Sequence, residues 1–223
     1  FAVQNDFNGR SVTVDGGTFT AQDSLFEQPG ETADMTAIDG GGVWVDAQGE
    51  VNILHSVFRN LAAKDGGAMM IENGTANVYE SSICNTSALS SGGAVSIEGT
   101  SVNPGVLNAY ELSISNCSAT NGGGIAVGGF GNLTLNDETV IEECHASSNG
   151  GGLHVSDAAN ATLRDTDLLL NEADLYGGGL YTDSSSTQMH NGTISSNTAK
   201  VYGGGIYIDD GALTLTNTIV SAN

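Results

Sequence analysis

Seven copies of a glycine-led motif recur along the chain, and the last of them reads Gly203-Gly204-Gly205-Ile206-Tyr207-Ile208. Each copy is a glycine pair and a small residue, followed in most copies by an apolar, a variable and a second apolar residue. The copies begin at Gly40, Gly66, Gly92, Gly122, Gly150, Gly177 and Gly203, which places them 26, 26, 30, 28, 27 and 26 residues apart. So regular a period is typical of a solenoid in which each repeat is one structural unit.

Further alternating runs follow each glycine motif, as in Leu133-Thr134-Leu135 and Thr139-Val140-Ile141. Three short strands per repeat, a period of two residues and the lack of a helical stripe indicate one coil of a parallel β-helix. No single repeat can bury its apolar residues alone, so the repeats must stack around a common core. The sequence therefore predicts an all-β, single-stranded parallel β-helix of about seven full coils plus a partial N-terminal coil.

The repeats divide the chain into three segments. Residues 1–22 are expected to form a partial first coil, and residues 23–39 a longer connecting loop with a turn at Pro29-Gly30. Residues 40–223 are expected to form the seven-coil β-helix. Because Asn223 is itself a repeat-ending asparagine, we expect a fragment of a longer repeat protein, packed end to end with further coils or other chains.

The chain is strongly acidic, with 26 Asp and Glu against 5 Lys and Arg and a formal charge of −21. A nucleic-acid partner is excluded because phosphate binding requires clustered basic residues. The same charge disfavours an anionic membrane surface. No apolar run approaches the roughly 20 residues of a membrane span, so we expect no direct membrane insertion of this segment.

A second recurring position precedes the next glycine pair by six or seven residues. We expect these residues to form an internal ladder whose amides bond the next coil and the backbone of the turn, as buried amides require. The predicted rungs are Asn60, Asn85, Asn116, Cys144, Asn171, Asn197 and Asn223. Cys117 lies beside the rung before Cys144, and the two cysteines either form a disulfide or act as small buried hydrophobes.

The middle residue of the first strand points outward if Val43 and Val45 point inward. The outward column contains a predicted ligand surface, made of Trp44, Met70, His154, Tyr181 and Tyr207. Such a strip, taken as flat and accessible, suits a sugar ring or the surface of another protein. The alternative is that these aromatic residues only stabilise the stacking of the strands.

The residue after this strand is acidic in five of the seven repeats, namely Asp46, Glu72, Glu98, Asp183 and Asp209. Stacked coils would place neighbouring carboxylates about 4.8 Å apart, where they repel unless a cation lies between them. Hard cations such as Ca²⁺ accept several carboxylate oxygens, so calcium binding by this column is one hypothesis. The alternative is a solvated acidic rim that keeps the rod soluble. No other cofactor is predicted.

Two further functions compete with a binding surface. His154, Tyr181, Asp183 and Asp209 on adjacent coils are the only plausible catalytic set for a polysaccharide lyase or glycoside hydrolase. Few basic residues lie near them to neutralise a uronate, and the net charge repels polyuronates. A regular, uncharged column offers an ice-binding face, formed by Asn52, Asn77, Asn108, Thr134, Thr162, Gln188 and Thr214.

Four glycosylation sequons occur, at Asn73, Asn132, Asn160 and Asn191. Asn85 and Asn116 also begin sequons, but as ladder rungs they would stay unmodified.

Two tetrapeptides carry a family resemblance. Gly92-Gly93-Ala94-Val95 resembles the Gly-Gly-Ala-Ile/Leu/Val repeat of the polymorphic outer membrane proteins, and Ile194-Ser195-Ser196-Asn197 resembles their Phe-x-x-Asn repeat with Ile in place of Phe. The likeness covers about residues 12–223. It implies a right-handed β-helix of the pectate-lyase-like group in a surface-exposed adhesive or structural region. The expected function is a non-catalytic scaffold, extracellular or at the cell surface, with a protein or glycan partner.

Overall fold

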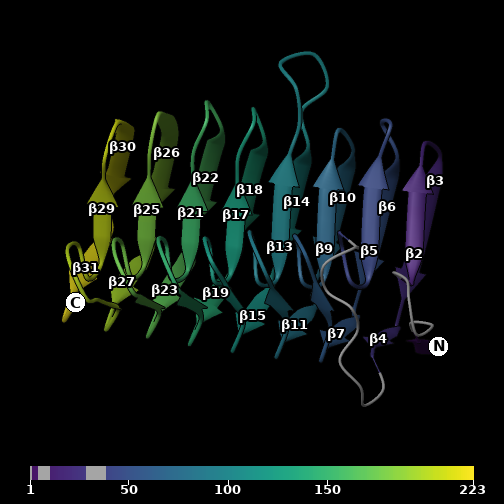
Figure 1. The fold of residues 1–223 in the computed structure, drawn as a ribbon, viewed down its shortest axis with the longest axis horizontal. Coiled ribbons are helices and arrows are strands. Elements are labelled where there is room, and N and C mark those ends of the chain that lie inside the picture. The colour runs from purple at the N-terminus through teal and green to yellow at the C-terminus, as the bar shows by residue number, and fades with distance from the viewer. Residues whose placement is uncertain (1, 5–10, 29–38) are drawn as a thin grey trace.

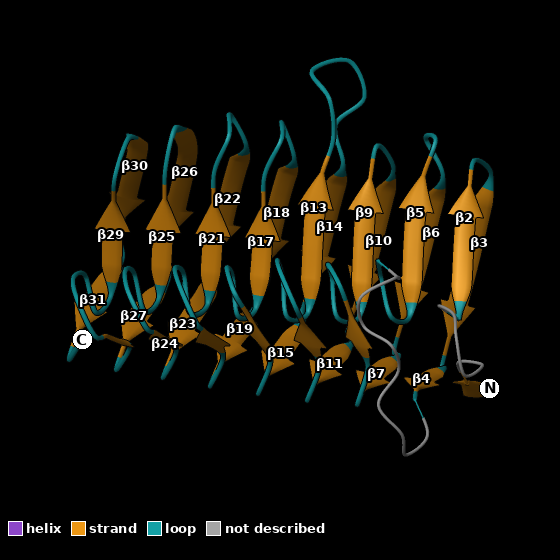
Figure 2. Ribbon diagram, viewed as in Figure 1, coloured by secondary structure: helices purple, strands orange, loops and turns teal. Residues whose placement is uncertain are grey.

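The computed structural model describes residues 2–4, 11–28 and 39–223, which form a rod of stacked coils (Figure 1). Within these residues all of the regular structure is β-strand, and every strand pair is parallel (Figure 2). Neighbouring strands in each sheet come from successive repeats, as where Trp44 pairs with Met70. The predicted parallel β-helix is confirmed.

Four sheets run along the rod. Sheet 1 contains β2 (Val12–Asp15), β5 (Val43–Asp46), β9 (Met69–Glu72), β13 (Val95–Glu98), β17 (Ile125–Val127), β21 (Leu153–Val155), β25 (Leu180–Thr182) and β29 (Ile206–Ile208). Sheet 2 contains β3 (Thr18–Gln22), β6 (Glu50–Leu54), β10 (Thr75–Tyr79), β14 (Val106–Tyr110), β18 (Asn132–Asn136), β22 (Asn160–Arg164), β26 (Ser185–His190) and β30 (Gly211–Thr216). Sheet 3 contains β1 (Ala2–Gln4), β4 (Leu25–Glu27), β7 (Val57–Arg59), β11 (Ser82–Cys84), β15 (Ser113–Ser115), β19 (Thr139–Glu142), β23 (Thr166–Leu169), β27 (Thr193–Ser195) and β31 (Ile219–Ser221). Sheet 4 contains β8 (Ala62–Ala63), β12 (Ser87–Ala88), β16 (Ser118–Ala119), β20 (His145–Ala146), β24 (Glu172–Ala173) and β28 (Thr198–Ala199).

The core lies inside the coils, where the alternating apolar residues of all the sheets meet. Val43 and Val45 of β5 and Ile53 of β6 are fully buried. Phe26 and Phe58 stack in sheet 3 with ring centroids 4.2 Å apart. Each such side chain contributes about 1.5–3 kcal/mol by leaving water, so stacking supplies the stability that one repeat lacks.

The glycine pair forms the corner that leads into sheet 1. Gly92 has φ of +66°, and a Cβ there would collide with the carbonyl oxygen of Val95. The next residue, Gly93, donates its N–H to the carbonyl of Gly122 one coil away at 3.0 Å. Only glycine fits both the left-handed conformation and this close approach, which explains why the pair recurs.

The third motif residue faces the interior, although strict alternation with Val43 predicts that Gly42 points outward. A Cβ on Gly42 would lie 3.0 Å from the Phe58 ring. The corner breaks the alternation, so small residues are required here by the core.

Two details of the predicted organisation are corrected. Six coils have four strands rather than three, because the two-residue strands of sheet 4 are too short to show alternation in the sequence; among the described residues the first and the last coil have no strand in that sheet. The N-terminal coil already includes a strand of sheet 1, β2, paired with β5, and it continues through β4 inside the predicted loop of residues 23–39. The turn predicted at Pro29-Gly30 lies outside the described residues.

The predicted ladder is shifted by one residue in its first half. Asn60, Asn85 and Asn116 are exposed, with φ of 54°, 53° and 54°. Cys144, Asn171 and Asn197 each lie directly before a strand of sheet 4. In the earlier coils, the residue in the same place is the one that follows the predicted asparagine and lies directly before the sheet 4 strand. The inner column is therefore Leu61, Thr86, Cys117, Cys144, Asn171, Asn197 and Asn223. Asparagine also occupies the exposed corner just before the inner position, where it tolerates the left-handed conformation, so residue type selected Asn60, Asn85 and Asn116.

Within the described part of the inner column, the amide ladder begins at Asn171 and continues toward the C-terminus. The Asn171 Nδ2 donates to the carbonyl of Ile141 at 2.9 Å, and its Oδ1 accepts from the Cys144 N–H at 3.0 Å. The Asn197 Oδ1 in turn accepts from the N–H and the Nδ2 of Asn171. Asn223 repeats these contacts toward Asn197. For these three rungs, the predicted structural role is confirmed.

Candidate ligand-binding groove

The predicted outward column of sheet 1 is in register along the rod. Trp44, Met70, Ser96, Ala126, His154, Tyr181 and Tyr207 pair in that order. The strip is recessed rather than flat, since Met70 is only 4% exposed and Tyr181 6%. A wall rises beside it where the residues before the glycine pairs bridge from coil to coil, as Tyr176 does with Asn149 and Tyr202. The column is therefore the floor of a groove.

Aromatic rings stack along the C-terminal part of this floor. The His154 and Tyr181 centroids are 4.8 Å apart, and those of Tyr181 and Tyr207 are 5.8 Å apart. Tyr176, from the wall, stacks on Tyr207 at 4.7 Å. The stack ends at His154 because the next two rungs are the small residues Ala126 and Ser96. Ring faces within the stack are covered by their neighbours, so the predicted surface does not offer each ring separately.

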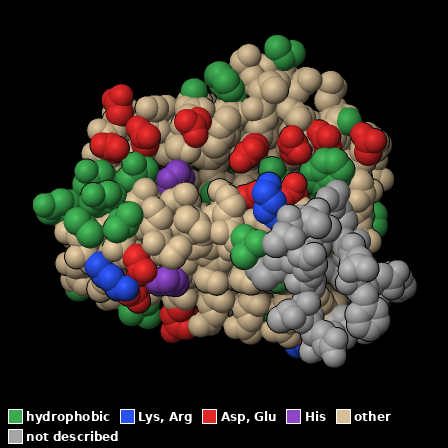
Figure 3. All heavy atoms as spheres, in the orientation of Figure 1, with side chains coloured by type: hydrophobic (Ala, Val, Ile, Leu, Met, Phe, Trp, Pro, Cys, Tyr) green, Lys and Arg blue, Asp and Glu red, His purple; other side chains and the backbone are tan. Residues whose placement is uncertain are grey.

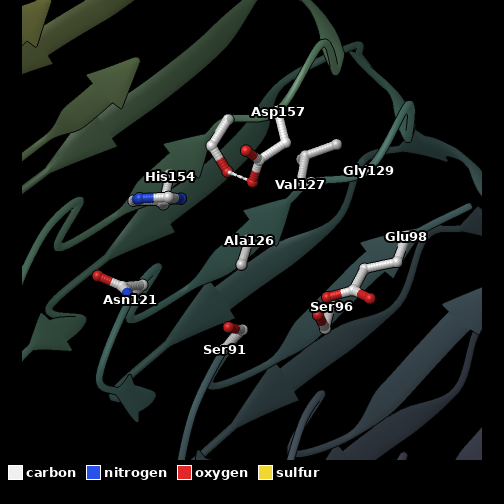
Figure 4. A pocket seen from close by; sticks show the side chains of 11 residues that line it. Ser91, Ser96, Glu98, Asn121, Ala126, Val127, Gly129, His154 and Asp157 are labelled. Atoms are coloured by element: carbon white, nitrogen blue, oxygen red, sulfur yellow. Dashed lines mark hydrogen bonds between the residues drawn. The ribbon is translucent and has the colours of Figure 1, made fainter. Parts of the chain in front are cut away.

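A cavity of about 370 Å³ lies where the stack ends. Figure 4 shows the His154 ring edge-on, with Ala126, Ser91 and Ser96 on the side away from the stack. Glu98 and Asp157 line the cavity from the other edge of the groove, and Ser156 donates to Asp157 at 3.0 Å. The cavity combines the face of the half-buried His154 ring with hydroxyl and carboxylate groups.

Burial dominates the electrostatics of the two central rings. It lowers the pKa of His154 to about 4, although Asp157 and Asp183 act in the opposite direction. Burial also raises the pKa of Tyr181 to about 12, and Asp209 adds to that shift. Both rings are therefore neutral at pH 7.

The predicted acidic column follows the edge of the groove, where carboxylates form a row in Figure 3. Gly128 and Ser156 divide it into one run with Asp46, Glu72 and Glu98 and another with Asp183 and Asp209. Loss of solvent raises the pKa of Glu98, and the charges of Asp65 and Glu72 raise it further. Two of the carboxylates are engaged, since Asp46 accepts from Asn73 at 3.2 Å and Asp209 from the Tyr181 hydroxyl at 3.3 Å.

The acidic column does not bring three ligand atoms together. Among the described residues, the one cluster of three possible ligands within 4.8 Å of one another is His145, Glu172 and Asp174 on the surface near sheet 4. Lys200 already lies 2.7 Å from Asp174 there. The sequence missed this cluster because its members lie 27 and 29 residues apart from His145 and meet only when the coils stack. Calcium binding by the acidic column stays a prediction.

The predicted catalytic set is assembled only in part. His154 stacks on Tyr181, and Tyr181 donates to Asp209, with Asp183 close enough to influence both rings. A general base works best with a pKa near the working pH. Burial moves the pKa of His154 below that range and the pKa of Tyr181 above it.

Comparison with known families identifies the architecture. A family model described as "Right handed beta helix region" matches residues 41–223. The chain belongs to this right-handed β-helix family. No curated protein and no solved structure matches the chain.

Sheet 2 of this β-helix carries the column predicted to bind ice. Its register is as expected, but the amides bond one another: Asn77 donates to Asn52 and Asn108 to Asn77, each at 3.0 Å. Amide groups that already bond one another along the rod have fewer free hydrogen-bond donors and acceptors for the water molecules of an ice surface.

The sequons of this β-helix differ in their surroundings. Asn160 and Asn191 are exposed, whereas Asn73 and Asn132 are half-buried. All four amides are hydrogen bonded: Asn73 donates to Asp46, Asn160 donates to Asn132, and Asn191 accepts from Asn217. The exposure of Asn85 and Asn116 removes the reason for expecting these two to stay unmodified.

The two inner cysteines of this β-helix are free and occupy adjacent rungs. A hydrogen bond with Cys117, together with burial, holds the pKa of Cys144 well above its ordinary value. In this structure they act as small buried residues of the core.

The described ranges include no helix long and apolar enough to cross a membrane.

Proposed function

We propose that this β-helix is a non-catalytic structural or adhesive element, extracellular or at the cell surface, which binds a glycan along the outer face of sheet 1. The main support for this proposal is the groove, in which an aromatic stack on the floor ends beside a cavity that is lined by hydroxyl and carboxylate groups. Sugar recognition uses these two components together, because the ring face contacts C–H groups while polar side chains bond the hydroxyls.

The resemblance to polymorphic outer membrane protein repeats supports the surface location, as does the strong negative charge, which favours solubility. A glycan suits the groove better than an apolar protein surface, because the cavity lining is rich in hydroxyl and carboxylate groups. End-to-end packing with further coils or other chains is a separate proposal that this function does not need.

The pKa directions of the rings support a non-catalytic function. Burial lowers the pKa of His154 and raises the pKa of Tyr181, so neither ring is tuned to exchange a proton near pH 7. The alternative of a lyase or hydrolase predicts new reducing ends or unsaturated products. We expect neither from a panel of polysaccharides incubated with the chain.

Trp44 makes the proposal directly measurable, because it is the single tryptophan of the chain and lies on the floor of the groove. Neutral and amino-sugar oligosaccharides titrated into the protein should change its fluorescence and bind in calorimetry. His154→Ala should weaken binding by removing the ring at the end of the stack. Tyr79→Ala is the matched control, because Tyr79 stacks on Tyr110 in sheet 2 with centroids 5.1 Å apart. If no glycan binds, or if both variants weaken binding equally, the proposal is wrong.

A further inference from the structure

The aromatic column of sheet 1 has two rungs without a large side chain. Proceeding toward the N-terminus, the order is His154, Ala126, Ser96 and Met70, with one coil between successive residues. With coils about 4.8 Å apart, the two small rungs leave a gap several ångströms deep along the stack. The 370 Å³ cavity occupies this gap, bordered by the His154 ring.

The lining of the gap is polar and anionic. Glu98 and Asp157 face it from the rim, and Ser91 and Asn121 line it from the wall. Among the described residues that line the cavity there is no Lys or Arg, and His154 is neutral at pH 7. The nearby Lys64 pairs with Asp65 at 3.0 Å and with Asp39 at 3.8 Å, and its charge acts on Glu98 less than the neighbouring carboxylates do. A ligand in this gap therefore meets two carboxylates that nothing in the lining neutralises.

Ser96 and Ala126 close the bottom of the gap, because their side chains are only 1% and 5% exposed. The residues of the lining that a ligand can reach are half-buried ones, namely Ser91, Asn121 and His154, together with the rim carboxylates.

From this geometry we propose that the gap is a subsite for an amino sugar with a free, protonated amine, stacked on the His154 ring as a replacement for the missing rungs. The proposal rests on the proposed glycan-binding function and names the substrate class. The sugar ring covers His154 and lies over Ser96 and Ala126, its hydroxyls bond Ser91 and Asn121, and its ammonium group lies between Glu98 and Asp157. An N-acetylated sugar lacks the positive charge, and a uronate would add a third carboxylate to the two already there.

The first experiment compares glucosamine oligomers with their N-acetylated counterparts of equal length, by calorimetry and by Trp44 fluorescence. We expect the amine form to bind at least about tenfold more tightly, because hydrogen bonds to charged groups contribute more than neutral ones. Glu98→Gln and Asp157→Asn should each reduce amine binding by about tenfold and leave N-acetyl binding nearly unchanged. Glu111→Gln is the control, because Glu111 lies at the corner between sheets 2 and 3 and is exposed.

The second experiment completes the stack. Ala126→Tyr adds an aromatic ring beside His154 and should abolish binding while the protein stays folded, since the new ring extends an existing column. Thr134→Tyr places the same side chain on the outer face of sheet 2 and should leave binding unchanged.

The outcomes separate the two proposals. If N-acetylated oligomers bind as tightly as amine oligomers and Ala126→Tyr removes both, glycan binding stands and the amine subsite is wrong. If no oligosaccharide binds, both proposals fail. If a lysine-rich peptide competes fully and Ala126→Tyr does not disturb the binding of amine oligomers, the acidic rim acts as a general cation surface and the subsite is also wrong.

Discussion

The two halves of the rod fill the same positions with different chemistry. In the N-terminal half, the inner column holds Leu61, Thr86 and Cys117, while in the C-terminal half it holds Asn171, Asn197 and Asn223. Outside, the small rungs Ser96 and Ala126 give way to the stacked rings from His154 onward. The stacking of the coils therefore determines whether a side chain points inward or outward. It does not determine the residue type, because either apolar packing or amide hydrogen bonds can stabilise the inner column.

The difference matters for cooperativity between coils. An apolar rung gains most of its stability from leaving water, which any well-packed neighbour provides. An amide rung depends on specific donors and acceptors in the adjacent coils, because a buried polar group without a partner is costly. We therefore expect the C-terminal half to be more sensitive to single substitutions on the inner column.

The largest effect is expected at Asn171, in the middle of the amide ladder. Asn171→Ala leaves the Cys144 N–H and the Ile141 carbonyl without side-chain partners inside the core. Two unsatisfied buried groups and a small cavity should cost about 4 kcal/mol of unfolding free energy, measured by urea denaturation. A loss below about 1 kcal/mol would show that the amide ladder does not stabilise this half.

The matched change in the N-terminal half is Leu61→Ala. Leu61 is 1% exposed and occupies the same column, but its side chain makes no hydrogen bond, so truncating it leaves no donor or acceptor without a partner. The cost should be about 3 kcal/mol, which is that of a buried leucine and the cavity it leaves. If urea denaturation shows this variant to be less stable than Asn171→Ala, the comparison between the halves is reversed.

A third prediction concerns His154, at the start of the aromatic half. Its pKa is about 4 in the folded protein against 6.5 for the free group, so the unfolded chain binds the extra proton between these values. The stability due to neutral His154 is present above pH 6.5 and is lost as the pH falls toward 4, by about 3 kcal/mol.

His154→Gln should remove this part of the pH dependence of the unfolding free energy. His190→Gln, at the end of a sheet 2 strand, should retain it. Equal pH profiles for the wild type and His154→Gln would contradict the buried, neutral state of this ring.

The smallest effect is expected at Asn223, the last amide rung. It makes the same kinds of contact as Asn171, including a bond from its Nδ2 to the Ile194 carbonyl at 2.9 Å, but it is exposed. Water can replace its partners, so Asn223→Ala should cost about 1 kcal/mol in urea denaturation. A cost equal to that of Asn171→Ala would mean that burial does not set the strength of a rung.

Much of the fold could be predicted because each repeat of the sequence specifies the same corner and the same strands. The recurring Gly92-Gly93 type of corner and the alternation around Trp44 and Met70 predicted the parallel coils and the register of sheets 1 and 2. The two-residue strands of sheet 4 and the strand at Leu25–Glu27 could not be found, because segments so short have no period to detect.

The candidate site was predicted as a column but not as a cavity. The predicted ligand surface contained the large side chains Trp44, Met70, His154, Tyr181 and Tyr207. It left out Ser96 and Ala126, which form the gap, because a small residue at an outward position does not stand out in a sequence as a binding residue. The ladder was misplaced in its first half for a related reason. Asparagine is favoured both in the buried column and at the exposed left-handed corner, and residue type alone does not distinguish Asn116 from Asn171.

The amino-acid sequence by itself determined the architecture, because glycine spacing and period-two alternation are local properties that every repeat restates. The tertiary structure decided which residues face inward at the corners, where the amide ladder begins, and that the aromatic strip is the floor of a groove with a gap. These features depend on contacts between residues about one repeat apart, and a single-residue difference in turn length changes them without altering the local pattern.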